Sequence, residues 1–335
     1  MLIYEVVLYN KIINCYRRAE EMQEVCYDYN PELKKPPVPT VVDFENKTVQ
    51  FFSTLTFKKE TRRVKQYKVP DDFRKDLFTV SCQDGYHLKC YSIEKDNGRK
   101  NKPAILYFHG GGFVSPLQTV IFDNAVYYAG ELDCKVIMPE YRVLPKHPFP
   151  TPLNDCYDAL KYFVENASKY GINQEKILVY GDSAGGCLAA AVTHMVRDYK
   201  LINLAGQMLI YPTVDNTFAF PSMKTFKLAA WPADSTPSIW RLYLKNGYGN
   251  LEKYAVPLKC TDFTGLPTAY VEPQEIDCLR DEAIAYANKL KEAGISTELN
   301  IIKGSYHGAD ADHSSPLIQR VLKHRCEVMS RMFAK

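Results

Sequence analysis

The chain has 335 residues, and its 42 basic and 39 acidic residues leave a net charge of +3. Apolar residues make up 46% and charged residues 24%, a composition typical of a soluble globule that excludes disordered, collagen-like and coiled-coil proteins. The near balance of charge argues against nucleic acid as a partner, because binding to a phosphate backbone needs a clustered basic face.

The first predicted element is an amphipathic helix at the start of the chain. Its apolar residues recur at alternating spacings of four and three, at Leu2, Val6, Tyr9, Ile13 and Tyr16. Charged residues interrupt the continuous apolar run that a signal peptide needs, and no stretch of eighteen apolar residues occurs, so no membrane span is expected. Ten scattered cysteines without a CxxC pair predict reduced thiols rather than disulfides or a thiol-bound metal. We therefore expect a cytoplasmic protein.

A second helix is predicted over about residues 41–57, after four prolines that lie between positions 31 and 39. Residues 1–60 are therefore predicted to be a helical unit that is added to a core of residues 61–335. The pattern then changes from helical to strand-like. Two alternating segments, DLFTVSC and YHLKCYSI, flank a Gln-Asp-Gly turn at 83–85 and predict an antiparallel hairpin.

Six short apolar runs follow the hairpin, mostly separated by helical patterns. They are AILYF (104–108), KVIMP (135–139), KILVY (176–180), QMLIY (207–211), TAYVE (268–272) and TELNII (297–302). Strands that alternate with crossover helices form a parallel sheet that is covered on both faces. The sequence therefore predicts an α/β fold.

The helices between these runs are predicted over about residues 122–132, 152–169, 184–199, 279–293 and 315–333, with Gly294 as a C-terminal cap. One interval breaks the alternation. More than fifty residues, rich in aromatic residues and proline, separate QMLIY from TAYVE, and this is longer than an ordinary crossover. Residues 213–250 are therefore predicted to be an insertion.

The motif Gly-Asp-Ser-Ala-Gly-Gly at 181–186 directly follows the strand KILVY and opens an alanine-rich helix. A strand, a tight turn and a helix in that order are the context of a nucleophile elbow, in which a serine hydroxyl is exposed and small residues let two backbone segments approach closely. The alternative is a buried serine that caps a helix. The context favours Ser183 as a nucleophile.

A second glycine run, HGGGF at 109–113, follows the strand AILYF. Acyl transfer builds negative charge on the former carbonyl oxygen, and glycines at a strand end can turn bare N–H groups toward that oxygen. We expect Gly111 and Gly112 to supply two donors and Ala184, next to the nucleophile, to supply a third. The alternative is a flexible glycine turn. His109 is expected to order this loop rather than to act as a base.

In an α/β hydrolase an acid and then a histidine follow the serine along the chain. Asp277 lies in the loop between the strand TAYVE and the next helix, and it is the preferred acid. Asp281 lies about a turn into that helix, where the helix dipole gives a carboxylate a sufficient structural role. Glu275 is the next alternative.

The preferred base is His307, which follows the last predicted strand and has Gly308 beside it. His313 and His324 are the competing histidines, and His324 is expected on the final helix. A lone histidine is usually structural, but His307 completes an ordered set of serine, acid and base.

At these residues the chain resembles the hormone-sensitive-lipase-like family of α/β-hydrolase carboxylesterases, which includes bacterial acetyl esterases and arylacetamide deacetylase-like enzymes. The resemblance rests on blocks in family order over most of residues 104–310: HGGGF (109–113), EYRVLPKHPFP (140–150), YGDSAGG (180–186), GLPTAYVEPQEIDCLRDE (265–282) and YHG (306–308). Pro273, Gln274 and Cys278 depart from the family pattern but leave Asp277 in register.

The resemblance implies an α/β-hydrolase fold, with an eight-stranded, mainly parallel sheet, helices on both faces and a helical cap built from residues 1–60 and 213–250. It also implies no cofactor or metal, and members of the family often form homodimers. The implied site comprises a catalytic triad of Ser183, Asp277 and His307 and an oxyanion hole of Gly111, Gly112 and Ala184.

The predicted reaction is hydrolysis of a small ester through an acyl-enzyme. Acetyl to butyryl esters are expected to react faster than long-chain lipids. The aromatic residues of the cap suggest an apolar acyl or alcohol pocket, although packing within the cap is the favoured role for them. Two alternatives stay open. The same triad can cleave small amides, and the same fold can serve as a non-catalytic ligand receptor.

Overall fold

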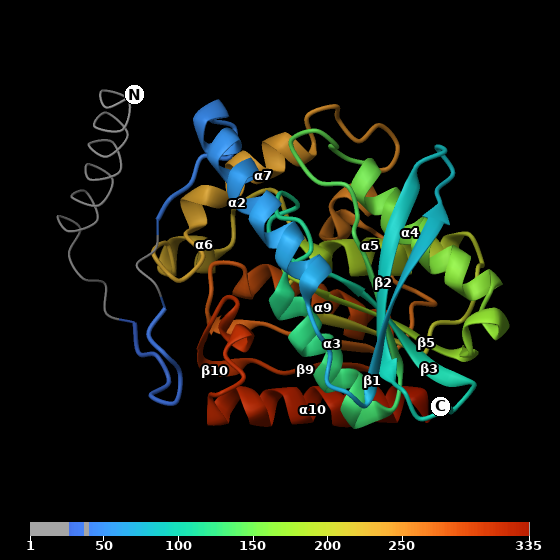
Figure 1. The fold of residues 1–335 in the computed structure, drawn as a ribbon. Helices are drawn as coiled ribbons and strands as arrows, with labels where there is room; N and C mark the ends of the chain where they lie inside the picture. The colour runs from blue at the N-terminus through green and yellow to red at the C-terminus, as the bar shows by residue number, and fades with distance from the viewer. Residues whose placement is uncertain (1–26, 37–39, 335) are drawn as a thin grey trace, which may run out of the picture.

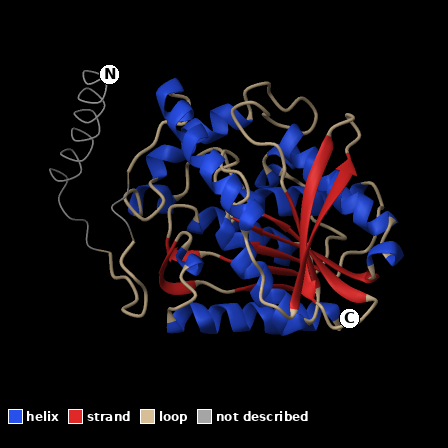
Figure 2. Ribbon diagram, viewed as in Figure 1, coloured by secondary structure: helices blue, strands red, loops and turns tan. Residues whose placement is uncertain are grey.

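The computed structural model describes residues 27–36 and 40–334, so the amphipathic helix predicted at the start of the chain lies outside the described residues. An eight-stranded sheet forms the centre, in the order β1-β2-β4-β3-β5-β6-β7-β9 (Figures 1 and 2). Its strands are β1 (Phe73–Ser81), β2 (His87–Lys95), β3 (Lys102–Phe108), β4 (Lys135–Pro139), β5 (Ile172–Asp182), β6 (Gly206–Ile210), β7 (Ala269–Glu272) and β9 (Thr297–Leu299).

The sheet is mainly parallel. Strands β1 and β2 form the predicted antiparallel hairpin, with Gly85 in its turn, and β2 also runs antiparallel to β4. Every other pair of neighbours, from β4 through β3, β5, β6 and β7 to β9, is parallel. The predicted eight-stranded, mainly parallel sheet is confirmed.

Helices cover both faces of this sheet. They are α3 (Thr119–Leu132) and α10 (Pro316–Phe333) on one face, and α4 (Thr151–Glu165), α5 (Ala184–Asp198) and α9 (Arg280–Glu292) on the other. Strand β3 is buried along its whole length, and its side chains alternate between the two layers: Leu106 packs with α4 and α5, whereas Tyr107 packs with α3 and α10. Gly294 follows α9 with a φ of 76°, as a C-terminal cap requires.

The prediction of one final strand over TELNII is wrong. Strand β9 ends at Leu299, and the chain then forms β10 (Ile302–Tyr306), which pairs with β8 (Gln274–Ile276) in a separate two-stranded sheet. Pro273, which follows β7, has no N–H to donate to the main sheet, so the chain leaves the sheet there. The Pro273 carbonyl accepts a hydrogen bond from Ile302 (3.1 Å), which starts the second pairing.

The helix predicted over residues 41–57 begins and ends later, as α2 (Lys47–Gln66). Asn46 caps it by accepting hydrogen bonds from Thr48 and Val49, and residues 44–45 before it form a turn closed by Asn46 N and Asp43 O (3.2 Å). The apolar periodicity ends at Phe57, but the strong helix formers that follow continue the helix until Val64 packs into the core.

The insertion, residues 213–250, contains the short helices α6 (Pro221–Thr225), Ala233–Ser235 and α7 (Thr236–Tyr243) (Figure 1). Phe44 stacks on Trp231 of the insertion with ring centroids 6.3 Å apart, and Glu45 pairs with Arg241 (2.6 Å). These contacts join the described N-terminal residues to the insertion. The remaining short helices are Ser168–Tyr170, α8 (Glu252–Ala255), Pro257–Lys259 and Ala309–Ala311.

The described part of the chain contains eight cysteines, all of them buried and free. Among the same residues there is no helix with the length and apolarity needed to cross a membrane, and no cluster of His, Cys, Asp or Glu that could hold a metal ion.

Candidate active site

Ser183 lies at the corner between β5 and α5, with φ 55° and ψ −119°. Its N–H donates a hydrogen bond to Ile210 O (2.9 Å), which holds the corner against the neighbouring strand. A Cβ on Gly185 would lie 1.9 Å from Phe108 O, so only glycine lets the start of α5 approach β3 this closely. The strained, positive-φ serine in a glycine-lined corner has the geometry of a nucleophile elbow.

Ser183, His307 and Asp277 form a hydrogen-bonded chain. His307 Nε2 lies 2.9 Å from Ser183 Oγ, and His307 Nδ1 lies 2.7 Å from Asp277 Oδ2. Asp277 is fully buried and also accepts a hydrogen bond from Leu279 N (3.1 Å), which fixes the orientation of its carboxylate. The structure therefore brings together the three side chains that chain order had selected.

The two-stranded sheet that the sequence reasoning missed explains why two of these residues meet. Strands β8 and β10 are parallel, and their last residues, Ile276 and Tyr306, are paired. The next residue of each strand is Asp277 and His307, respectively. Since paired parallel strands end side by side, the acid and the imidazole leave the pairing next to each other.

The surroundings of His307 favour its protonated form. Burial lowers the pKa of His307, but the charge and hydrogen bond of Asp277, together with the charges of Asp182 and Asp310, outweigh burial and raise the pKa above its ordinary value. Because Asp277 accepts the Nδ1 proton, the Nε2 lone pair of neutral His307 faces the Ser183 hydroxyl. The arrangement suits proton transfer from Ser183 to His307.

The glycine loop adjoins the elbow. Gly110 N–H donates to Asp182 Oδ2 (3.0 Å), which joins the loop to the residue before Ser183. Gly111 and Gly112 have φ of 106° and 62°, where glycine is favoured. Within the described chain, the N–H groups of Gly111, Gly112 and Ala184 donate to no protein acceptor. Three amides are therefore available to an oxyanion.

His109 orders the glycine loop, as expected. Its buried ring stacks on Tyr141 with centroids 4.1 Å apart, and its Nδ1 lies 2.8 Å from Gly110 O. Burial lowers the pKa of His109 to about 4, so the ring is neutral at pH 7.

The competing acids and histidines have other partners. Asp281 accepts from Ser222 N, Glu275 pairs with Lys303, His313 binds Asn124 and His324, on α10, binds Glu298. These contacts give each of the four a structural role away from Ser183.

A small cavity of about 20 Å³ lies beside Ser183. Its wall includes Gly112, Phe113, Thr213, Trp231, Thr236, Ile239, Trp240 and Leu279. The Trp231 ring also lies 5.9 Å from His307 between centroids. The sequence indicated an aromatic-rich insertion but not which of its residues reach the site, because that depends on how the insertion folds back.

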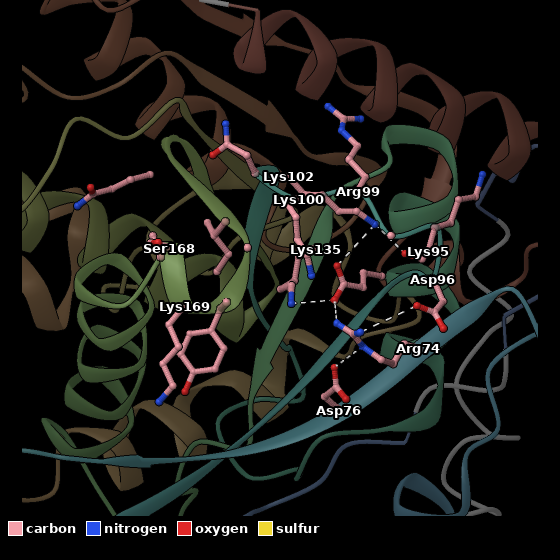
Figure 3. Close-up of a pocket in the computed structure, with 18 of the residues that line it drawn as sticks. Arg74, Asp76, Lys95, Asp96, Arg99, Lys100, Lys102, Lys135, Ser168 and Lys169 are labelled. Carbon is pink, nitrogen blue, oxygen red and sulfur yellow. Dashed lines mark hydrogen bonds and ion pairs between the residues drawn. The ribbon is translucent and has the colours of Figure 1, made fainter.

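A larger cavity of about 710 Å³, here called the basic pocket, lies at the amino ends of β3 and β4 and is lined by Arg74, Glu94, Lys102, Lys135 and their neighbours (Figure 3). Glu94 pairs with Lys135 (2.8 Å), Lys102 (3.6 Å) and Arg74. Arg74, Lys102 and Lys135 of the basic pocket are already paired with Glu94, and the pocket is lined by none of Ser183, Asp277 and His307. The small cavity beside Ser183 is therefore the candidate active site.

The alpha/beta hydrolase fold family matches residues 105–311. The chain is similar to an arylesterase of Saccharolobus solfataricus (32% identical, covering 66% of this chain and 71% of the relative) and to the carboxylesterase NlhH of Mycobacterium tuberculosis (31%, covering 63% and 67%). Among solved structures it is similar to a bacterial heroin esterase, with a TM-score of 0.79, 30% identity and coverage of 91% of this chain and 98% of that chain.

Proposed function

The chain belongs to the alpha/beta hydrolase fold family, as its resemblance to the hormone-sensitive-lipase-like carboxylesterases predicted. We propose that it is a serine carboxylesterase for small acyl esters. The observation that carries this proposal is the hydrogen-bonded chain from Ser183 Oγ through His307 to Asp277, at 2.9 and 2.7 Å. Similarity to proteins named arylesterase and carboxylesterase supports the same reaction class.

In the proposed reaction Ser183 attacks the ester carbonyl while His307 Nε2 takes the hydroxyl proton. Asp277 holds the imidazole and stabilises its charged form without taking the proton. His307 then protonates the departing alcohol, and the acyl group remains on Ser183. A water molecule, activated by His307 in the same way, releases the acid and regenerates the serine.

The oxyanion of each tetrahedral intermediate is proposed to accept hydrogen bonds from the backbone N–H groups of Gly111, Gly112 and Ala184. These donors are fixed before the reaction and have no protein acceptor among the described residues, so little reorganisation opposes their use. The chemistry requires no cofactor or metal ion.

Short acyl groups, from acetyl to butyryl, are the proposed substrates. The cavity beside Ser183 holds about 20 Å³, little more than the space of one water molecule, which supports a small acyl group. We also propose that residues 1–60 and the insertion at 213–250 form a cap over this site. The contacts of Phe44 with Trp231, and of Trp231 with His307, support this division.

The proposal is tested by turnover of p-nitrophenyl acetate and by labelling with an organophosphonate that modifies active serines. The Ser183→Ala variant should lose turnover by about 10⁶-fold and should not be labelled. Ser314→Ala, which removes a hydroxyl bound to Asp312 at the surface, is the matched control and should behave as wild type. Near-normal turnover by Ser183→Ala would overturn the proposal. Faster cleavage of p-nitroacetanilide than of the ester would instead identify an amidase.

A further inference from the structure

Arg325, on the final helix α10, is fully buried beneath the proposed site. Its Nε donates to Glu272 Oε2 (3.0 Å), and its Nη2 donates to the other oxygen of the same carboxylate. Its Nη1 donates to Asp310 Oδ2 (2.8 Å) and to the Tyr180 hydroxyl (3.1 Å). One planar guanidinium therefore connects three segments that are distant in sequence.

Each of these partners belongs to a segment that carries a proposed triad residue. Tyr180 lies on β5, three residues before Ser183. Glu272 is the last residue of β7, five residues before Asp277, and Asp310 lies three residues after His307. A displacement of any one segment would break a hydrogen bond to Arg325.

A second contact carries this connection to the imidazole itself. The Tyr211 hydroxyl donates to Asp310 Oδ1 (2.6 Å), while the Tyr211 ring packs on His307 with centroids 4.7 Å apart. Tyr211 has a φ of 33°, which is strained for a tyrosine, and its N–H is held by Glu272 O (2.7 Å). The network therefore fixes the ring against which the imidazole rests.

The charges in this network are not balanced by Arg325 alone. Two buried carboxylates, Glu272 and Asp310, face one cation, and Asp182 lies close enough for burial and the Asp310 charge to raise its pKa to about 7. Buried charges need partners with good geometry, so the positions of these side chains are closely constrained. The excess negative charge also favours protonated His307.

We propose that Arg325, acting through Asp310 and Tyr211, is a positioning residue that holds the segments bearing Ser183, Asp277 and His307 in reacting geometry. This inference rests on the proposed esterase function. Arg325 touches neither substrate nor the reacting atoms, so its contribution is to kcat rather than to substrate affinity. The same network predicts that the charge of Asp310 raises the proton affinity of His307.

The sharpest variant is Asp310→Asn, which keeps the shape of the side chain. The amide can accept from Arg325 or from Tyr211 but presents its NH2 group to the other donor, so one of the two contacts is lost. We expect kcat to fall about 10- to 100-fold with KM unchanged, because small misplacements of reacting groups have effects of this size.

The same variant should change the pH profile in a defined direction. The acidic groups that face His307 are Asp277 from the loop after β8, Asp182 from the end of β5 and Asp310 from its own loop. The Tyr211 ring and the Trp231 ring pack against it without charge at neutral pH. Removal of the Asp310 charge lowers the pKa of His307, so the acid limb of the kcat profile should move to lower pH.

Tyr211→Phe is the second variant, because it keeps the ring on His307 and removes only the hydroxyl. It should lower kcat about 10-fold while leaving the acid limb nearly unmoved, since no charge is lost.

Glu94→Gln is the matched control: Glu94 is also a buried carboxylate bound by basic side chains, but it lies in the basic pocket. It should weaken folding without changing kcat or the acid limb.

Two kinetic results would overturn the inference. One is kcat within twofold of wild type in both Asp310→Asn and Tyr211→Phe. The other is an equal fall of kcat in Glu94→Gln, which would make the loss a general effect of destabilisation.

Titration of His307 by nitrogen-15 NMR needs no turnover. An unchanged pKa of His307 in Asp310→Asn would contradict the proposed effect of Asp310 on the proton affinity of His307. Failure of the esterase proposal is recognised separately, by a wild-type enzyme that turns over no faster than Ser183→Ala.

Discussion

Two buried charge clusters lie at opposite ends of the sheet, and their charges are reversed. At the amino ends of β3 and β4, the carboxylate of Glu94 lies among Lys102, Lys135 and Arg74. At the carboxyl ends of the strands, the guanidinium of Arg325 lies between Glu272 and Asp310. The first cluster opens into a pocket of about 710 Å³, whereas the second lies under a site whose cavity is about 20 Å³.

The larger of the two cavities is therefore not the one beside the proposed triad. The Glu94 cluster joins β1, β2, β3 and β4, which carry none of the proposed triad residues. The Arg325 cluster joins the three segments that do. Loss of the Glu94 cluster should therefore lower stability alone, whereas loss of the Arg325 cluster should lower both stability and catalysis.

The comparison is tested most severely at Asp277, where the largest effect is expected. Asp277→Asn keeps the shape of the side chain but replaces an acceptor of the His307 Nδ1 proton by a group that can favour the wrong tautomer. We expect kcat for p-nitrophenyl acetate to fall about 10⁴-fold. Asp281→Asn, which affects only contacts with Ser222 and Arg280, should stay within a few fold of wild type. A larger loss in Asp281→Asn would reverse the assignment of the acid.

Most of the fold could be predicted from the sequence because its signals are local. Apolar runs, glycine caps and helical periodicity gave the order of strands and helices. The split of TELNII into β9 and β10 could not be predicted, since it depends on Pro273, a residue distant in sequence whose carbonyl binds Ile302. The later end of α2 was missed because charged helix formers, rather than apolar spacing, continue it.

The second prediction concerns stability at the opposite end of the sheet. Glu94→Gln leaves buried Lys135 without a carboxylate partner, whereas Lys102 keeps Asp133 (3.2 Å), and loss of one partner in a buried ion pair costs about 3–5 kcal/mol. We expect a fall of this size in the free energy of unfolding, measured with urea, and unchanged kcat. A matching loss of kcat would remove the distinction between the two clusters.

The pH dependence of that stability has a defined sign. Burial raises the pKa of Glu94, but Lys135, Arg74 and Lys102 outweigh burial and hold the pKa below its usual value. The stabilisation is therefore fully present above the unfolded-state pKa of a glutamate and is lost as the pH falls through the lower folded-state pKa. The difference between wild type and Glu94→Gln should shrink in that acidic range.

A glycine from each region gives the third prediction. Gly112 has a φ of 62°, and a Cβ there would lie 2.6 Å from Ile239 Cδ1. Gly112→Ala should displace a proposed oxyanion donor and lower kcat by about 10² to 10³. Gly98, beside the basic pocket, also has a positive φ of 71° but has nothing within 4 Å of its missing Cβ. Gly98→Ala should therefore leave kcat unchanged, and equal losses in the two variants would contradict the proposed role of Gly112.

Motif reasoning selected Ser183, Asp277 and His307 because chain order and strand ends are visible in one sequence. The residues that surround them are not. Arg325 interrupts the apolar stripe of α10 between Leu322 and Met329, which was an available signal of a buried charge. Its partners lie 53 and 145 residues away, at Glu272 and Tyr180, and only the folded chain brings them together.

The smallest expected effect concerns the acyl group, and it sharpens the contrast between a closed site and an open pocket. Ile239 lines the cavity beside Ser183, and the described residues show no contact of Ile239 with His307 or with the Arg325 cluster. Trp231 also lines the cavity, but it packs on His307, so its substitution would disturb the proposed base as well. Ile239→Ala removes apolar volume from the wall without a catalytic group, so longer acyl chains gain space. Since one methylene in an apolar pocket is worth about 10-fold or more in kcat/KM, the ratio of butyryl to acetyl p-nitrophenyl ester turnover should rise about 10-fold. Leu77→Ala, on the exposed face of β1, is the control and should leave the ratio unchanged. A wild-type enzyme that already hydrolyses a twelve-carbon ester faster than a four-carbon ester would show that this cavity does not set acyl preference.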